Sequence, residues 1–87
     1  MKLLKIITGA HKKYSNWIRS LDRDALHTET INILMLAADE SDLESELHWK
    51  RSACCMEWIR RDGDDTEYCR ALDEAAVKID QEGKNNN

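Results

Sequence analysis

The sequence contains no proline and only three glycines among its 87 residues. These two residue types interrupt helices most strongly, so their scarcity favours helix along most of the chain. Hydrophobic residues make up 41% and charged residues 34%, a balance typical of folded proteins and unlike that of disordered chains. The length suffices for one domain with one modest core. We therefore expect a single all-α domain.

Cysteine is also scarce, and its three copies are poorly placed for disulfide bonds. Cys54 and Cys55 are adjacent, which gives poor geometry for an ordinary disulfide, and an odd number cannot pair completely. The pattern favours a reducing, cytoplasmic compartment. The first residues resemble a secretion signal, but Lys5 interrupts the apolar run and no Ala-x-Ala site follows. No apolar run reaches about 18 residues, so we expect no transmembrane segment.

The known motifs of catalysis and metal binding are missing as well. The sequence has no nucleophile elbow, no phosphate-binding glycine loop and no HExxH pattern. His48 and the three cysteines lack the C-x-x-C spacing of a zinc site. Residues 62–67 resemble part of a calcium loop, but Glu67 stands where an EF-hand requires glycine. We expect no enzyme activity, no cofactor and no bound metal.

Charge is abundant, and it is unevenly distributed. The net charge is −4, yet residues 1–21 contain five basic side chains and no acidic one. The remaining residues contain eight basic and seventeen acidic side chains, a net charge of −9. The basic end therefore has three candidate partners: the acidic body of the same chain, another molecule, or a membrane surface.

The spacing of apolar residues predicts a bundle of three or four helices, over residues 2–20, 23–38, 41–62 and 65–82. In the first helix, apolar residues recur in alternating steps of four and three, at Leu3, Ile7, Ala10, Tyr14, Trp17 and Leu21. The second helix is apolar in every direction, so we expect it to be the most enclosed part of the fold. We assign residues 1–83 to one helical domain and expect residues 84–87 to be disordered.

Capping residues suggest where these helices begin and end. Asp22 is suited to start the second helix, and Ser41 precedes Glu44 at the spacing of a capping box. Gly63 is suited to a left-handed helix end, and we expect Gly83 to end the last helix. Because neither glycine nor proline separates the second and third helices, one continuous helix from about residue 24 to 61 is the alternative.

The stretch 43–63 contains two of the three tryptophans and two of the three cysteines. Placed on a helical wheel, its apolar residues cover more than half of the circumference, so we expect one side to meet the core and another to meet a partner. The predicted core residues, completed by the last helix, are Leu47, Cys54, Trp58, Tyr68, Leu72 and Ile79. The predicted partner-binding residues are Trp49, Lys50, Arg51, Met56 and Arg60.

These features favour a non-enzymatic module that binds another protein. We expect a larger host or cellular protein as the partner, and a homodimer formed through the surplus apolar surface. Small acidic proteins without catalytic motifs often inhibit a larger machine, as phage anti-defence proteins of the anti-CRISPR type do. That comparison is an analogy, since no motif of such a family is present.

Two other classes of function are open. Tryptophan and arginine alternate along the third helix, which suggests a nucleic-acid or nucleotide binder, although the acidic body opposes contact with phosphate. The basic first helix suggests an adaptor on a membrane surface.

Overall fold

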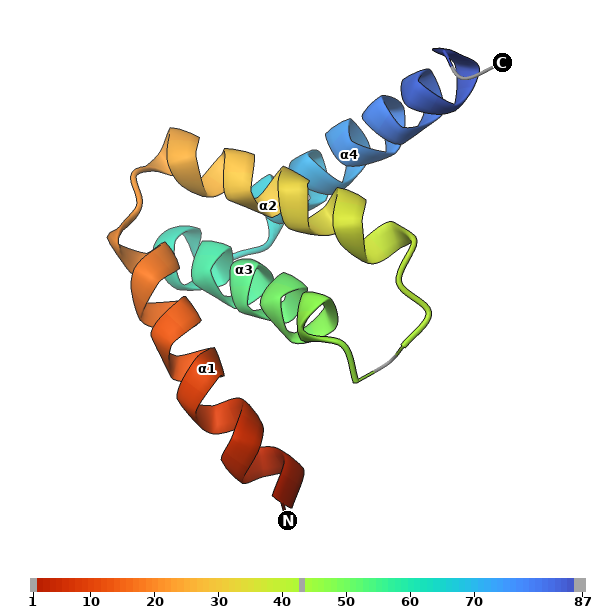
Figure 1. The fold of residues 1–87 in the computed structure, drawn as a ribbon. Helices are drawn as coiled ribbons and strands as arrows, with labels where there is room; N and C mark the ends of the chain where they lie inside the picture. Colours follow the sequence, from red (N-terminus) through yellow and green to blue (C-terminus); the bar gives the residue numbers. More distant parts are fainter. Residues whose placement is uncertain (1, 43, 86–87) are drawn as a thin grey trace.

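Four helices are present in the computed structural model (Figure 1). They are α1 (Lys2–Ser20), α2 (Arg23–Ala38), α3 (Glu46–Asp62) and α4 (Thr66–Asn85). The structure describes the backbone of residues 2–42 and 44–85, and the side chains of residues 9–42 and 44–82. No strand occurs in these ranges. The predicted all-α fold is therefore confirmed.

Helices α1 and α2 have the predicted bounds, and Asp22 explains where α2 begins. The Asp22 side chain accepts a hydrogen bond from the Ala25 backbone N–H at 2.8 Å. Such a cap satisfies an amide group that the first turn of a helix leaves unpaired. The short turn between α1 and α2 follows from this cap.

Helix α3 begins at Glu46 rather than at residue 41, and its N-cap is Ser45 rather than the predicted Ser41. The loop before it is stabilised by its own acidic side chains. The carboxylates of Glu40 and Asp42 each accept a hydrogen bond from the backbone N–H two residues ahead, both at 3.0 Å. These local bonds compete with helix formation. They separate α2 from α3, so the alternative of one continuous helix is wrong.

Gly63 ends α3 in the left-handed conformation, as predicted. Its φ is 84°, and its N–H donates to the Ile59 carbonyl at 2.8 Å. Glycine adopts this conformation without the steric cost that a Cβ atom would add.

Helix α4 starts beside a second acidic turn and extends farther than predicted. The Asp64 carboxylate accepts a hydrogen bond from the Thr66 N–H at 3.1 Å. The helix continues to Asn85, so Gly83 does not end it. Residues 86 and 87 of the predicted tail lie outside the described residues.

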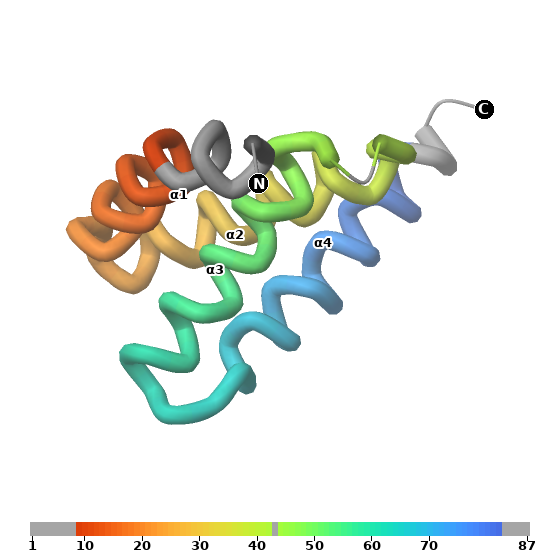
Figure 2. Tube along the Cα trace, turned by 90° about the horizontal axis from the view of Figure 1, so that it is seen from below, coloured from red at the N-terminus to blue at the C-terminus, as the bar shows by residue number. Residues whose placement is uncertain are grey.

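Helix α2 is the central helix of the fold. It packs against α3 and against α4, while α1 packs against α3 (Figures 1 and 2). Contact on several sides explains why so much of α2 is apolar. Its buried residues are Leu26, Thr30, Ile31, Ile33, Leu34 and Ala37.

The core consists of two groups of buried side chains. The first joins α1, α2 and α3 through Ile18, Leu26, Ala53, Cys54 and Trp58. The second joins α2 and α4 through Ile31, Leu34, Ala71 and Ala75. Tyr68 packs against both groups, so the half-buried tyrosine links them.

Trp58 connects α3 to α2 by a hydrogen bond as well as by packing. Its side chain is 1% exposed, and its indole Nε1 donates to the Thr30 hydroxyl at 3.1 Å. The Thr30 hydroxyl in turn donates to the Leu26 carbonyl at 2.7 Å. A buried indole N–H needs such an acceptor, so Thr30 permits the complete burial of Trp58.

Leu72 and Ile79 do not belong to the core, contrary to prediction. They are 46% and 38% exposed, and α4 instead turns Ala71 and Ala75 toward α2. Every described side chain from residue 76 to 82 is exposed. The second half of α4 therefore projects beyond the packed helices, as Figure 1 shows.

Candidate functional site

The side of α3 that was predicted to be core lies against α2. Cys54 and Trp58 are buried there, and Leu47 is half-buried. On the side of α3 that was predicted to face a partner, Trp49 and Lys50 lie against α1. Most of the apolar surplus of α3 is therefore covered by its own chain.

Trp49 and Lys50 are not the free binding surface that the sequence predicted, because α1 covers them in part. The Trp49 ring centroid lies 5.0 Å from that of His11 and 5.7 Å from that of Tyr14. The Lys50 ammonium lies 5.1 Å from the Tyr14 ring centroid and 3.6 Å from the Glu46 carboxylate. These contacts help to hold α1 on α3.

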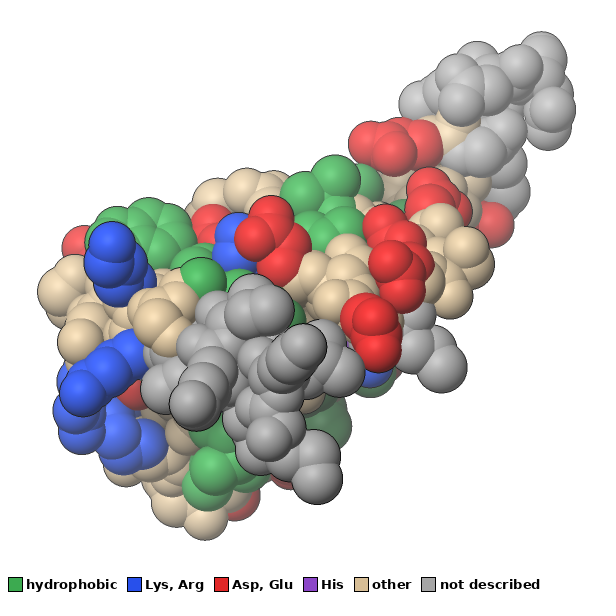
Figure 3. Space-filling view, turned by 60° about the horizontal axis from the view of Figure 1, so that its bottom comes forward, with side chains coloured by type: hydrophobic (Ala, Val, Ile, Leu, Met, Phe, Trp, Pro, Cys, Tyr) green, Lys and Arg blue, Asp and Glu red, His purple; other side chains and the backbone are tan. Residues whose placement is uncertain are grey.

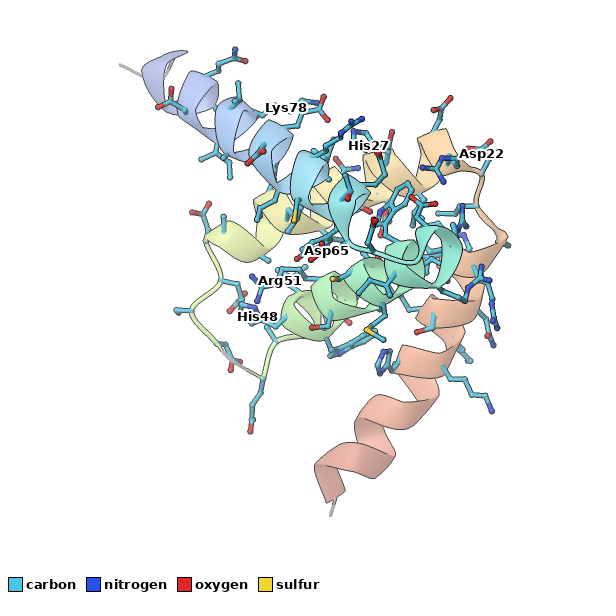
Figure 4. All side chains as sticks on the ribbon, turned by 180° about the vertical axis from the view of Figure 1, so that it is seen from behind. Asp22, His27, His48, Arg51, Asp65 and Lys78 are labelled. Atoms are coloured by element: carbon cyan, nitrogen blue, oxygen red, sulfur yellow. The ribbon has the colours of Figure 1, made fainter. Side chains whose placement is uncertain are left out.

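Arg51 is exposed but lies apart from the other predicted partner residues. Figure 4 shows it near His48 and the loop that precedes α3, on the side of α3 away from α1. It cannot contribute to a surface formed with α1.

Met56 and Arg60 line a groove between α1 and α3 with a volume of about 380 Å³. Ile18 and Ala53 are buried and form its apolar floor. The Met56 side chain is 63% exposed, and Arg19 joins Arg60 as a second exposed cation in the lining. This α1/α3 groove is thus an apolar surface that carries two positive charges.

Glu57 is the one carboxylate in the groove lining, and two arginines neutralise it. The residue is 6% exposed. Arg60 donates to both of its oxygens, at 3.0 and 2.6 Å, and Arg61 Nε donates to one of them at 2.7 Å. The bonds from Arg60 lower the pKa of the Glu57 carboxyl, so it stays charged at neutral pH. The lining therefore keeps a positive excess.

Arg61 also binds the end of α1. Its Nη2 donates to the backbone carbonyls of Ile18, Arg19 and Leu21 at 3.1, 3.2 and 2.6 Å. The last carbonyls of a helix have no partner within the helix and carry partial negative charge. Arg61 thus fixes the position of α1 beside α3, and with it the width of the groove.

Positive charge extends beyond the groove along α1. Lys12 and Lys13 are exposed on that helix, and α1 carries no acidic residue. Figure 3 shows Lys and Arg side chains gathered at one end of the molecule, and Asp and Glu side chains along the part that leads to α4. The molecule has a basic end and an acidic end.

The thiols are not part of this groove. Burial raises the pKa of the Cys54 thiol, whose Sγ lies 3.4 Å from the Tyr14 hydroxyl. Desolvation also raises the pKa of Cys55 and of Cys69. These cysteines are protonated at neutral pH, which makes them poor nucleophiles. In the ranges that the structure describes, no three His, Cys, Asp or Glu side chains gather as metal ligands.

A second, smaller hollow of about 210 Å³ lies between α2 and α4. His27 of α2 and Lys78 of α4 border it, as Figure 4 indicates. His27 Nε2 lies 2.7 Å from the Glu74 carboxylate, so these two lining side chains contact each other.

The sequence pattern did not predict the residues of α1 that line the groove. The predicted apolar row of α1 contained Trp17, which is exposed, and omitted Ile18, which is buried. The two residues are neighbours on the helix, and either one fits a spacing of three or four from Tyr14. Arg19 could have been recognised as a candidate binding residue, because it is one of the basic residues that distinguish residues 1–21 from the acidic remainder.

The sequence matches no family model, and neither curated proteins nor solved structures give a match. Across the described helices, none has both the length and the apolar composition needed to cross a membrane.

Proposed function

We propose that this chain is a non-enzymatic binding module whose α1/α3 groove holds an acidic amphipathic helix of another, larger protein. In this role it acts as a small inhibitor or adaptor. The observation that carries the proposal is the groove itself, an apolar floor bordered by Arg19 and Arg60.

The shape and chemistry of the groove support a helical ligand. Helices that bind in grooves present an apolar face to an apolar floor and use charged flanks for orientation. Met56 offers an exposed, flexible apolar side chain, which suits contact with a partner surface. The lining has two arginines, Arg19 and Arg60, against one carboxylate, Glu57, to which Arg60 is bound. The positive excess attracts carboxylates, and such complementarity raises association rates and selects against basic ligands.

Nucleic-acid binding is the weaker candidate because its stacking residues are occupied. Nucleic-acid binding through α3 needs the rings of Trp49 and Trp58 to be exposed beside arginines, because bases stack on exposed aromatic rings. Trp58 is buried, and Trp49 packs against His11 and Tyr14. On α1, Lys12, Lys13 and Arg19 supply positive charge, and Trp17 is a half-exposed ring that packs against Tyr14.

The proposal is tested by titrating the ¹⁵N-labelled chain with three probes and recording amide chemical shifts. The probes are a synthetic helical peptide of leucine and glutamate, a single-stranded oligonucleotide, and vesicles of anionic phospholipid. We expect the peptide to shift the amides of Ser15, Ser52 and Ala53, which line the groove. Met56→Glu should abolish these shifts. Leu36→Glu is the matched control, because Leu36 is similarly exposed but lies on α2 outside the groove.

The other outcomes would contradict the proposal. Shifts produced by the oligonucleotide along Lys12 and Lys13, lost as salt is raised, would support nucleic-acid binding instead. Broadening of α1 signals by the vesicles alone would support a role at membrane surfaces. Peptide shifts that survive Met56→Glu would place the ligand outside the groove.

A further inference from the structure

Helix α4, from Leu72 into its projecting second half, has the features of the ligand that the groove requires. Leu72, Ala76 and Ile79 follow one another at spacings of four and three, so they form one stripe along the helix. Leu72 and Ile79 are exposed, since the core contact of α4 is made by Ala71 and Ala75. The stripe is thus a ready apolar face that the described part of the chain leaves in solvent.

Acidic residues accompany this stripe. Asp73 and Asp80 lie along one flank of it, and residues 73–82 contain four acidic side chains and one lysine. The segment is therefore an acidic amphipathic helix. Its charge is opposite to that of the groove, where Arg19 and Arg60 border the apolar floor.

The projecting half of α4 points away from α1, which forms one wall of the groove (Figure 1). A chain cannot place its own α4 in its own groove in this arrangement. Two copies lying side by side in opposite directions can each place α4 beside the groove of the other. Such a reciprocal pair has two-fold symmetry, so it closes at two copies and makes the same contact twice.

We propose that the α1/α3 groove binds α4 of a second copy of this chain, which gives a reciprocal dimer. This inference rests on the proposed function, because it names the first occupant of the same groove. A foreign acidic helix then has to displace α4 before it binds. In the dimer, α4 of each copy occupies the groove of the other, so the partner cannot bind there. Binding of the partner dissociates the dimer.

Pairing of α4 with α4 is the competing arrangement, since it would also cover the Leu72–Ile79 stripe. It would bring Asp73 and Asp80 of one copy near the same acidic residues of the other. Like charges brought together in this way oppose association. Docking of α4 in the basic groove places the same carboxylates beside arginines, so charge favours the groove.

Sedimentation velocity of the purified chain at micromolar concentration tests this proposal. We expect a dimer for the natural sequence, and self-association weaker by about tenfold or more for either Met56→Glu in the groove or Ile79→Asp in α4. Both residues are exposed, so both variants should keep the circular dichroism spectrum of the natural protein, and their melting temperature should fall only by the stabilisation that dimer formation provides. Val77→Asp is the matched control, because Val77 is exposed on α4 about 100° around the helix from Ala76.

Mixing the two defective variants gives the decisive result. The Met56→Glu copy retains a normal α4, and the Ile79→Asp copy retains a normal groove, so a heterodimer has one intact contact. The mixture should therefore associate more tightly than either variant alone, although more weakly than the natural chain with its two contacts. If Met56→Glu leaves the dimer intact, or if the mixture associates no more tightly than either variant alone, docking of α4 in the groove is overturned. A monomeric natural chain would also overturn it, without affecting the peptide titration that tests the groove as a binding site.

Discussion

Arg61 joins the end of α1 to a buried carboxylate of α3. It contacts Glu57 on its own helix and three carbonyls at the end of α1. Arg60 next to it donates to Glu57, and its side chain is about half exposed. The two arginines therefore have different roles, although they are neighbours in the sequence.

This difference predicts different effects on stability. Arg61→Ala removes the side-chain donor to three backbone carbonyls at the end of α1 and in the turn after it, and one of the two arginines that bind the buried Glu57 carboxylate. It should lower the free energy of unfolding by about 2 kcal/mol. Arg60→Ala, the control, should cost less than about 1 kcal/mol because its ion pair is partly exposed. Urea denaturation of both variants measures the difference. Equal losses would mean that the bonds to α1 contribute little.

Glu57 should give the protein a specific sensitivity to acid. Because hydrogen bonds from Arg60 and Arg61 lower the folded-state pKa of Glu57, its contribution is present above the unfolded-state pKa, about 4.3 for glutamate. It is lost as the pH falls through the lower folded-state pKa. We expect the free energy of unfolding to fall more steeply below about pH 5 for the natural protein than for Glu57→Gln. Urea midpoints measured over a pH series decide this, and parallel curves would contradict it.

Which tryptophan is core was predictable only in part. The sequence shows that Trp49 and Trp58 lie on different sides of α3, and the structure agrees. The sequence does not show that α1 packs against the side of α3 that carries Trp49. That contact depends on the direction of α1 relative to the turn at Asp22. The burial of Trp58 also depends on Thr30, a residue distant in sequence that no periodic pattern identifies.

Among the helices, the sequence predicted a boundary correctly where a single capping residue sets it. Asp22 and Gly63 were recognisable because each acts through its own backbone geometry. The start of α3 was mistaken because Ser41 and Ser45 are both suitable caps. The choice between them depends on Glu40 and Asp42, whose carboxylates bind amides of the loop.

Gly63 and Gly9 provide a matched pair of substitutions. Gly63 has a positive φ, so Gly63→Ala should lower the free energy of unfolding by about 1 kcal/mol. Gly9 lies inside α1 and has open space where a Cβ atom would stand, so Gly9→Ala should raise it by about 0.5 to 1 kcal/mol. Thermal and urea unfolding measure both. The same sign for the two substitutions would contradict the conformations of these glycines.

The stripe on α4 shows what periodicity can and cannot predict. The pattern correctly grouped Leu72 with Ile79 on one face. It could not show that Ala71 and Ala75, which are smaller, make the contact with α2. Alanine allows two helices to approach closely, and this close packing turns the larger residues outward.

At the scale of the whole molecule, the helices form an open arrangement rather than a closed bundle. The chain extends over 44 × 30 × 18 Å, and α1 and α4 leave the packed region at opposite ends. The groove exists because α1 crosses α3 without a further helix to cover the junction. Composition indicated surplus apolar surface, but only the arrangement of α1, α3 and α4 locates it.

If the α1/α3 groove receives an acidic amphipathic helix, and α4 of a second copy is the first such helix, then α4 of one copy contacts the groove of the other. The most direct measurement is an isotope-filtered nuclear Overhauser experiment on a mixture of ¹³C-labelled and unlabelled chains, which detects only contacts between copies. We expect cross-peaks between the Met56 methyl group of one copy and the Leu72 and Ile79 methyl groups of the other. Cross-peaks between Ile79 of both copies, with none to Met56, would contradict it.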